Sequence, residues 1–234
     1  MNRWIIPALA LTLAACSPQL ETSDPVARGQ RDFNGLGCVK CHQIGDKGHA
    51  WGPDLTNLGF RKSTAWIDQW LKDPHAWNPK TVMPNFNLKD STRADLVAYL
   101  SAQKSQAWTV KPWETAAAAA LPASERGRII FNSVGCVSCH AKDGYGGYPN
   151  NNVAGGLINS LTLVTEGYSK AELHEKIKGG ATPIPNDLKK AAPMLQMPKW
   201  GQQLSAKEID AVVEYLYTLA PKKAPGAKPS QDDF

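Results

Sequence analysis

The feature that most constrains this 234-residue chain is a gapless internal repeat. Residues 28–38 align with residues 126–136 and share Arg, Gly, Phe, Asn, Gly and Cys at matching positions, with an offset of 98 residues. Further along each copy, a Met-Pro-x-aromatic sequence begins at Met83 in the first and at Met197 in the second. Such self-similarity predicts two copies of one small domain rather than one large domain.

Each copy also contains the sequence C-x-x-C-H directly after the aligned segment. Residues i and i+3 share one face of a helical turn, so both thiols can reach the two vinyl groups on one edge of a porphyrin while the next histidine points at the iron. The pattern therefore predicts two covalently bound haem c groups, at Cys38, Cys41 and His42 and at Cys136, Cys139 and His140. A redox dithiol lacks the following histidine, and a zinc site would bring four ligands together, whereas these pairs lie 98 residues apart.

The sixth iron ligand decides whether a haem transfers electrons or binds a substrate. Met83, which lies 41 residues after His42, is the only methionine of the first copy and is the predicted ligand there. In the second copy Met194 and Met197 compete, and Met197 is favoured because it aligns with Met83. The alternative role for such a methionine is to fill a gap in the core. Three further histidines are alternative ligands for which a structural role is favoured: His49, His75 and His174.

Helical periodicity predicts a helix at the end of each copy. An amphipathic helix ends each copy, with apolar residues spaced i, i+3, i+4 around Tyr99 and again around Val212. Ser205 and Glu208 predict a capping box for the second of these helices. Domains of roughly 80–100 residues are small for a hydrophobic core alone, so we expect the buried haem to complete each core.

The N-terminus predicts export to the periplasmic side of a membrane. In residues 1–15, Arg3 precedes an apolar stretch from Trp4 to Ala15. This stretch is too short to span a bilayer, which needs about 20 residues, and it is typical of a signal peptide. The sequence that ends at Cys16 resembles a bacterial lipobox, which predicts a lipid on Cys16, and Ser17 resembles the pattern of outer-membrane lipoproteins. The alternative is an ordinary signal cut near Ala15. With Cys16 acylated and four cysteines binding haem, none of the five remains for a disulfide.

The remaining boundaries follow from composition. We expect a tether over residues 16–25, a first domain over 26–106, a linker with a short helical piece over 107–122, a second domain over 123–220 and a disordered tail over 221–234. The 26 Lys and Arg residues outnumber the 21 Asp and Glu residues, which gives a formal net charge of +5. The basic residues form no run of five or more, so nucleic acid is not an expected partner.

The pattern resembles class I cytochromes c, and the resemblance extends from about Val26 to Leu219. It implies an all-α fold of two tandem cytochrome c domains, each a small helical fold around a covalently bound haem. In that family an N-terminal helix with Gly and an aromatic residue crosses a C-terminal helix with an aromatic residue, which here are Gly29, Phe33 and Tyr99, then Gly127, Phe131 and Tyr215. The family also has a Gly-Pro-x-Leu segment, which resembles residues 52–55 and implies that the Pro53 carbonyl accepts the His42 imidazole N–H. The second copy has a Gly- and Asn-rich loop instead, and 57 residues separate His140 from Met197.

The resemblance implies a relay of single electrons in an extracytoplasmic respiratory chain, as a free protein or as a subunit of a membrane complex. The expected partners are a redox protein donor and acceptor, with the membrane reached through the lipid, and no enzyme activity is expected. The alternative is a dihaem redox enzyme, peroxidase-like or thiosulfate-oxidising, which needs one open iron site. The Met-Pro sequence in both copies argues against that alternative.

Overall fold

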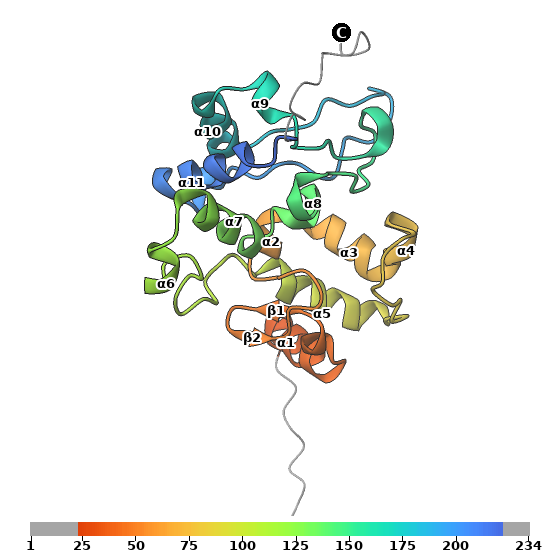
Figure 1. Ribbon diagram of the computed structural model, residues 1–234. Helices are drawn as coiled ribbons and strands as arrows, with labels where there is room; N and C mark the ends of the chain where they lie inside the picture. Colours follow the sequence, from red (N-terminus) through yellow and green to blue (C-terminus); the bar gives the residue numbers. More distant parts are fainter. Residues whose placement is uncertain (1–22, 222–234) are drawn as a thin grey trace, which may run out of the picture.

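The computed structural model describes residues 23–221, which form two helical domains packed against each other (Figure 1). The prediction of an all-α fold is confirmed: apart from the two-residue strands β1 (Gln43–Ile44) and β2 (Lys47–Gly48), the regular elements of this range are helices. The predicted signal peptide, Cys16 and nearly all of the predicted tail lie outside the described residues.

The first domain is organised by the crossing of α1 (Pro25–Gly35) and α5 (Asp90–Ser101). Helix α1 begins where the Asp24 side chain accepts a hydrogen bond from the Val26 N–H, at 2.9 Å, with proline at the first helical position. A Cβ atom at Gly29 would lie 2.0 Å from the Asp95 carbonyl oxygen, so only glycine lets the helices approach this closely. Phe33 and Tyr99 pack at the crossing, with ring centroids 5.5 Å apart.

Short elements complete the first domain between these two helices. They are the 3₁₀ helix η1 (Cys38–Lys40), α2 (Leu58–Arg61), α3 (Thr64–Lys72) and α4 (Pro74–Trp77). Ser63 caps α3, and Asp73 both ends α3 and caps α4. Helix α3 carries Trp66 and Trp70, and Trp66 is buried in the core.

The second domain repeats the same crossing with α7 (Ala123–Ser133) and α11 (Ala206–Tyr217). A Cβ atom at Gly127 would lie 1.8 Å from the Ala211 carbonyl oxygen, the counterpart of the close approach at Gly29. The predicted capping box of Ser205 and Glu208 is confirmed at the start of α11. The other elements are α8 (Val137–His140), η2 (Lys142–Gly144), η3 (Ala154–Gly156), α9 (Val164–Gly167), α10 (Lys170–Gly179) and η4 (Trp200–Gln202).

The segment expected as a linker contains α6 (Ala116–Ala119) and packs on the second domain. Trp113 is only 2% exposed and belongs to the core of that domain. Its indole N–H donates to the Glu208 carboxylate, and Lys111 Nζ lies 3.3 Å from the same carboxylate. The connection between the domains is therefore fixed at its second-domain end.

Side chains of each domain pack against the hydrophobic core of the other domain. Phe60 of the first domain packs on the second core, with its ring centroid 5.2 Å from that of Trp200. In return, Tyr148, Ile158 and Leu195 of the second domain pack with the first core. This interlocking places α2 and α3 of the first domain beside α8 of the second (Figure 1).

Candidate functional site

The first C-x-x-C-H motif forms a tight turn after Gly37, whose φ of +78° is a left-handed conformation that favours glycine. The turn closes through the His42 N–H, which donates to the Cys38 carbonyl oxygen at 2.9 Å. The Nδ1 atom of His42 lies 2.9 Å from the Pro53 carbonyl oxygen. This contact leaves Nε2 as the ring nitrogen available to a metal. A Cβ atom at Gly52 would lie 2.7 Å from the imidazole, so glycine makes room for the ring.

Met83 packs against the same hydrophobic core as Cys38 and Val39 of the first motif. Its sulfur accepts a hydrogen bond from Trp70 Nε1 at 3.0 Å. The Trp70 ring stacks on Trp66, with centroids 5.2 Å apart and planes inclined by 17°. The first motif and Met83 therefore pack on one common core, with two indole rings beside the methionine.

The second motif has the same turn with a different environment. Gly135 has φ of +90°, and the His140 N–H donates to the Cys136 carbonyl oxygen at 3.0 Å. The Nδ1 atom of His140 is buried and makes no hydrogen bond of standard geometry with the described residues, although the Asn159 backbone interacts with the imidazole. Burial lowers the pKa of His140 to about 4; the backbone of Asn159 opposes this shift, and the charge of Lys62 adds to it. The ring is thus neutral at pH 7, as a metal-binding imidazole must be.

The two candidate methionines of the second domain lie in different places. Met197 packs against the second core together with Cys136 and Val137. Its backbone pairs with Ala181 in both directions, with N···O distances of 3.0 and 2.9 Å. Met194 packs instead with the first domain's core, and its N–H donates to the Asn151 side chain at 2.7 Å. The arrangement favours Met197 as the partner of the second motif.

Two basic residues that the sequence did not single out join the motifs across the domain boundary. Arg61, at the end of α2, donates through Nη2 to the Asp54 carbonyl oxygen of its own domain at 2.7 Å. Through Nη1 it donates to two groups of the second domain, the Gly135 carbonyl oxygen at 3.3 Å and the Ser138 hydroxyl. Lys62 Nζ lies 3.2 Å from Cys139 Sγ. Both side chains are buried, and burial lowers the pKa of each.

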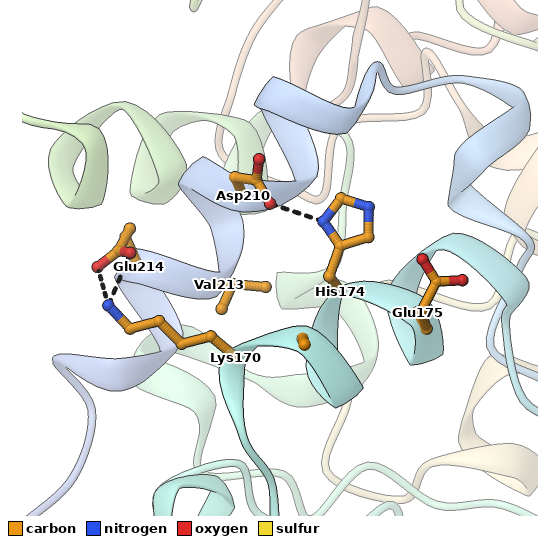
Figure 2. A pocket seen from close by; sticks show the side chains of 7 residues that line it. Lys170, His174, Glu175, Asp210, Val213 and Glu214 are labelled. Carbon is orange, nitrogen blue, oxygen red and sulfur yellow. Dashed lines mark hydrogen bonds and ion pairs between the residues drawn. The ribbon is translucent and has the colours of Figure 1, made fainter.

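Figure 2 shows a pocket on the second domain, between α10 and α11, that is separate from both motifs. His174 Nδ1 lies 2.6 Å from an Asp210 carboxylate oxygen, and Lys170 forms an ion pair with Glu214 at 2.7 Å. His174 is therefore engaged in a surface pair. His49 and His75 are exposed.

The residues of both sites fit a haem. In each domain the motif cysteines and one methionine pack on a common apolar core, and the four motif cysteines are free thiols. The buried indole Nε1 atoms of Trp66 and Trp77 are polar atoms that no group of the described residues satisfies. Within residues 23–221 no group of three or more His, Cys, Asp or Glu side chains could hold a metal ion, so a zinc site finds no support. No helix of that range is long and apolar enough to cross a membrane.

Comparisons with known proteins agree with this assignment. The sequence model of the cytochrome c family matches residues 26–104 and 124–220, one match for each copy. A segment of 86 residues is 30% identical to Cytochrome c oxidase subunit 2 of Alkalihalophilus pseudofirmus (strain ATCC BAA-2126 / JCM 17055 / OF4), covering 33% of this chain and 25% of that protein. No solved structure matches the chain. With both copies matched, the chain belongs to the cytochrome c family, as two tandem domains built for covalently bound haem and electron transfer.

Proposed function

We propose that this protein relays single electrons between two haem c groups, one in each domain. A bound haem c supplies an iron that exchanges one electron between its ferrous and ferric states. The chain would hold the first haem through Cys38, Cys41, His42 and Met83, and the second through Cys136, Cys139, His140 and Met197.

The observation that carries this proposal is a hydrogen-bonded connection between the domains beside the two motifs. Arg61 bonds both to the carbonyl oxygen of Asp54, which follows Pro53 in the first site, and to that of Gly135, which precedes the second motif. Each of the two cores also takes in side chains of the other domain, which supports the close approach of the two sites that a relay requires. An assembly of two independent carriers would not need such contacts.

A carrier role is favoured over a catalytic one because each site offers a methionine to its iron. A thioether ligand fills the sixth position, which leaves no open site for peroxide or another substrate. In the first domain the Trp70 N–H also holds the Met83 sulfur, at 3.0 Å. The second domain fixes Met197 through its backbone pairing with Ala181.

Absorption spectroscopy of the purified holoprotein tests the proposal. We expect two low-spin haems with the weak near-infrared thioether-to-iron band and no carbon monoxide binding at neutral pH. High-spin character, or prompt carbon monoxide binding by one haem, would reject the relay assignment for that domain and favour a dihaem redox enzyme.

We further propose that the relay works on the periplasmic side of a membrane, with a lipid on Cys16, and passes electrons to a membrane oxidase complex or belongs to one. The lipobox-like sequence supports the lipid, and the likeness to a cytochrome c oxidase subunit 2 supports the acceptor. Cys16→Ser should release the protein into the soluble periplasmic fraction. Purification from intact membranes should bring oxidase subunits with the wild-type protein, and their absence would contradict this acceptor.

A further inference from the structure

Lys62 is a buried lysine at the boundary between the domains, directly after α2. Only 6% of the residue is exposed, although a lysine is almost never buried without a partner of opposite charge. Its ammonium nitrogen lies 3.2 Å from Cys139 Sγ, 4.5 Å from the centroid of the Trp66 ring and 5.3 Å from that of Tyr148. Two aromatic faces and a sulfur atom thus surround the charge.

The contacts found for this ammonium among the described residues include no carboxylate. The neighbouring cation, Arg61, bonds to carbonyl and hydroxyl oxygens, which are neutral. Among the described residues, the carboxyl group that interacts with Arg61 is that of Asp54, whose own pKa is raised by burial. Once Cys139 has become a thioether, it too carries no charge. The boundary therefore holds excess positive charge.

Lys62 makes different contacts toward the two haem sites. On the second-domain side, Lys62 touches the sulfur through which the haem would be attached. On the first-domain side, the stacked rings of Trp66 and Trp70 separate it from the Met83 sulfur. Because Coulomb energy falls with distance and is large where water is excluded, the charge acts more strongly on the second site.

We propose that the positive charge of Lys62 raises the reduction potential of the second haem relative to that of the first. This inference rests on the proposed relay. One electron leaves the iron of the first site, which is oxidised, and reduces the iron of the second site, with no bond made or broken. A positive charge favours the reduced form because that form carries one positive charge less. The bias comes from the other domain, so it exists only while the domains are docked.

Spectroelectrochemical titration of the full-length holoprotein tests this assignment. Met83→His serves as the background, since a second histidine lowers the potential of the first haem relative to a thioether and so separates the two waves. In that background Lys62→Met should make the second haem about tenfold easier to oxidise, which is 59 mV for one electron. Lys62→Arg should keep the potential within a small fraction of that shift. Lys104→Met, which removes an exposed charge, should have little effect.

Lys62→Gln is the second neutral variant and should reproduce the shift of Lys62→Met, because both remove the charge and retain a side chain of similar length. An unchanged second potential in either neutral variant would overturn the proposal, as would equal shifts of both haems or the same shift in Lys104→Met. Carbon monoxide binding to wild-type protein would instead reject the relay itself, so the two failures are distinguishable.

Discussion

The two haem sites share a motif but differ in what surrounds it. At the first site Cys41 is exposed, and His42 contacts the Pro53 carbonyl oxygen of its own domain. At the second, His140 is buried beside the Asn159 backbone with no standard hydrogen bond to Nδ1, and basic side chains of the other domain touch Gly135 and Cys139. The repeat was therefore adapted differently in its two copies: the second motif also forms the interface between the domains.

The longer second copy supplies much of that interface. Three consecutive asparagines, Asn150 to Asn152, bond through their side chains to the backbone of residues 187–195, for example at 3.0 Å from Asn150 Nδ2 to the Leu195 carbonyl oxygen. This loop presents Tyr148, Ile158 and Leu195 to the first core. The sixteen extra residues between His140 and Met197 thus fall in the part of the chain that docks the domains.

The largest effect should come from removing the methionine ligands. Met83→Ala should give a high-spin, carbon monoxide-binding haem in the first domain alone, and Met197→Ala in the second alone, because each opens the sixth position of its own iron. Absorption spectra with and without carbon monoxide measure this. Met194→Ala is the matched control and should leave both haems closed, since Met194 packs with the first core. A second haem opened by Met194→Ala would reverse the assignment.

A substitution at the shared helix crossing should affect both domains alike. Gly29→Ala and Gly127→Ala would place a Cβ atom 2.0 and 1.8 Å from backbone oxygens, so the helices must separate. Each should lower the free energy of unfolding by about 3 kcal/mol or more, measured by thermal denaturation followed by circular dichroism. Gly35→Ala, with no atom within 4 Å of the added Cβ, is the control and should have no such cost. A tolerated Gly127→Ala would show that the crossings differ.

Alanine substitutions at the glycines before the two motifs should distinguish the cost of backbone strain from the cost of disturbing the domain interface. Gly37 and Gly135 have φ of +78° and +90°, so alanine at either costs about 1–2 kcal/mol. At Gly135 the Cβ atom would also lie 2.5 Å from the Arg61 guanidinium, whereas at Gly37 the nearest atom is a Lys40 side-chain carbon at 3.4 Å. Gly135→Ala should therefore lose more stability and increase the radius of gyration in small-angle X-ray scattering. Equal losses and unchanged scattering would contradict a docking role for Arg61.

The smallest predicted effect concerns the contact of the linker with Glu208 of the second domain. Burial raises the pKa of Glu208, but hydrogen bonds from Trp113 and Ser205 and the charge of Lys111 outweigh this and leave it lowered. A carboxyl group whose pKa is lowered by folding stabilises the fold at pH values above its unfolded pKa, which is about 4.3. This stabilisation is lost as the pH falls through the lower pKa of the folded state. Glu208→Gln should thus cost about 1 kcal/mol at neutral pH and progressively less in acid.

Thermal unfolding of the wild type and Glu208→Gln across this pH range measures the difference. Glu166→Gln, at an exposed position on α9, is the control and should change stability by less than about 0.5 kcal/mol. A cost for Glu208→Gln that does not depend on pH would contradict the ionic role of this carboxylate.

The local part of this architecture could be predicted from the sequence, and the long-range part could not. Periodicity predicted α5 and α11, and a capping box predicted the start of α11, because those signals lie within a few residues of one another. The contact of Arg61 with Gly135 joins residues 74 positions apart and depends on how the domains dock, which no local pattern encodes. Trp113 likewise read as part of a linker, since its burial depends on Glu208, 95 residues away.

The central claim, that the two sites form one relay, is tested most directly by laser-flash photoreduction of the oxidised holoprotein with less than one electron per molecule. The account predicts that the electron redistributes between the haems in a first-order phase whose rate does not depend on protein concentration. A redistribution rate proportional to protein concentration would show that electrons pass only between molecules, and would contradict the relay.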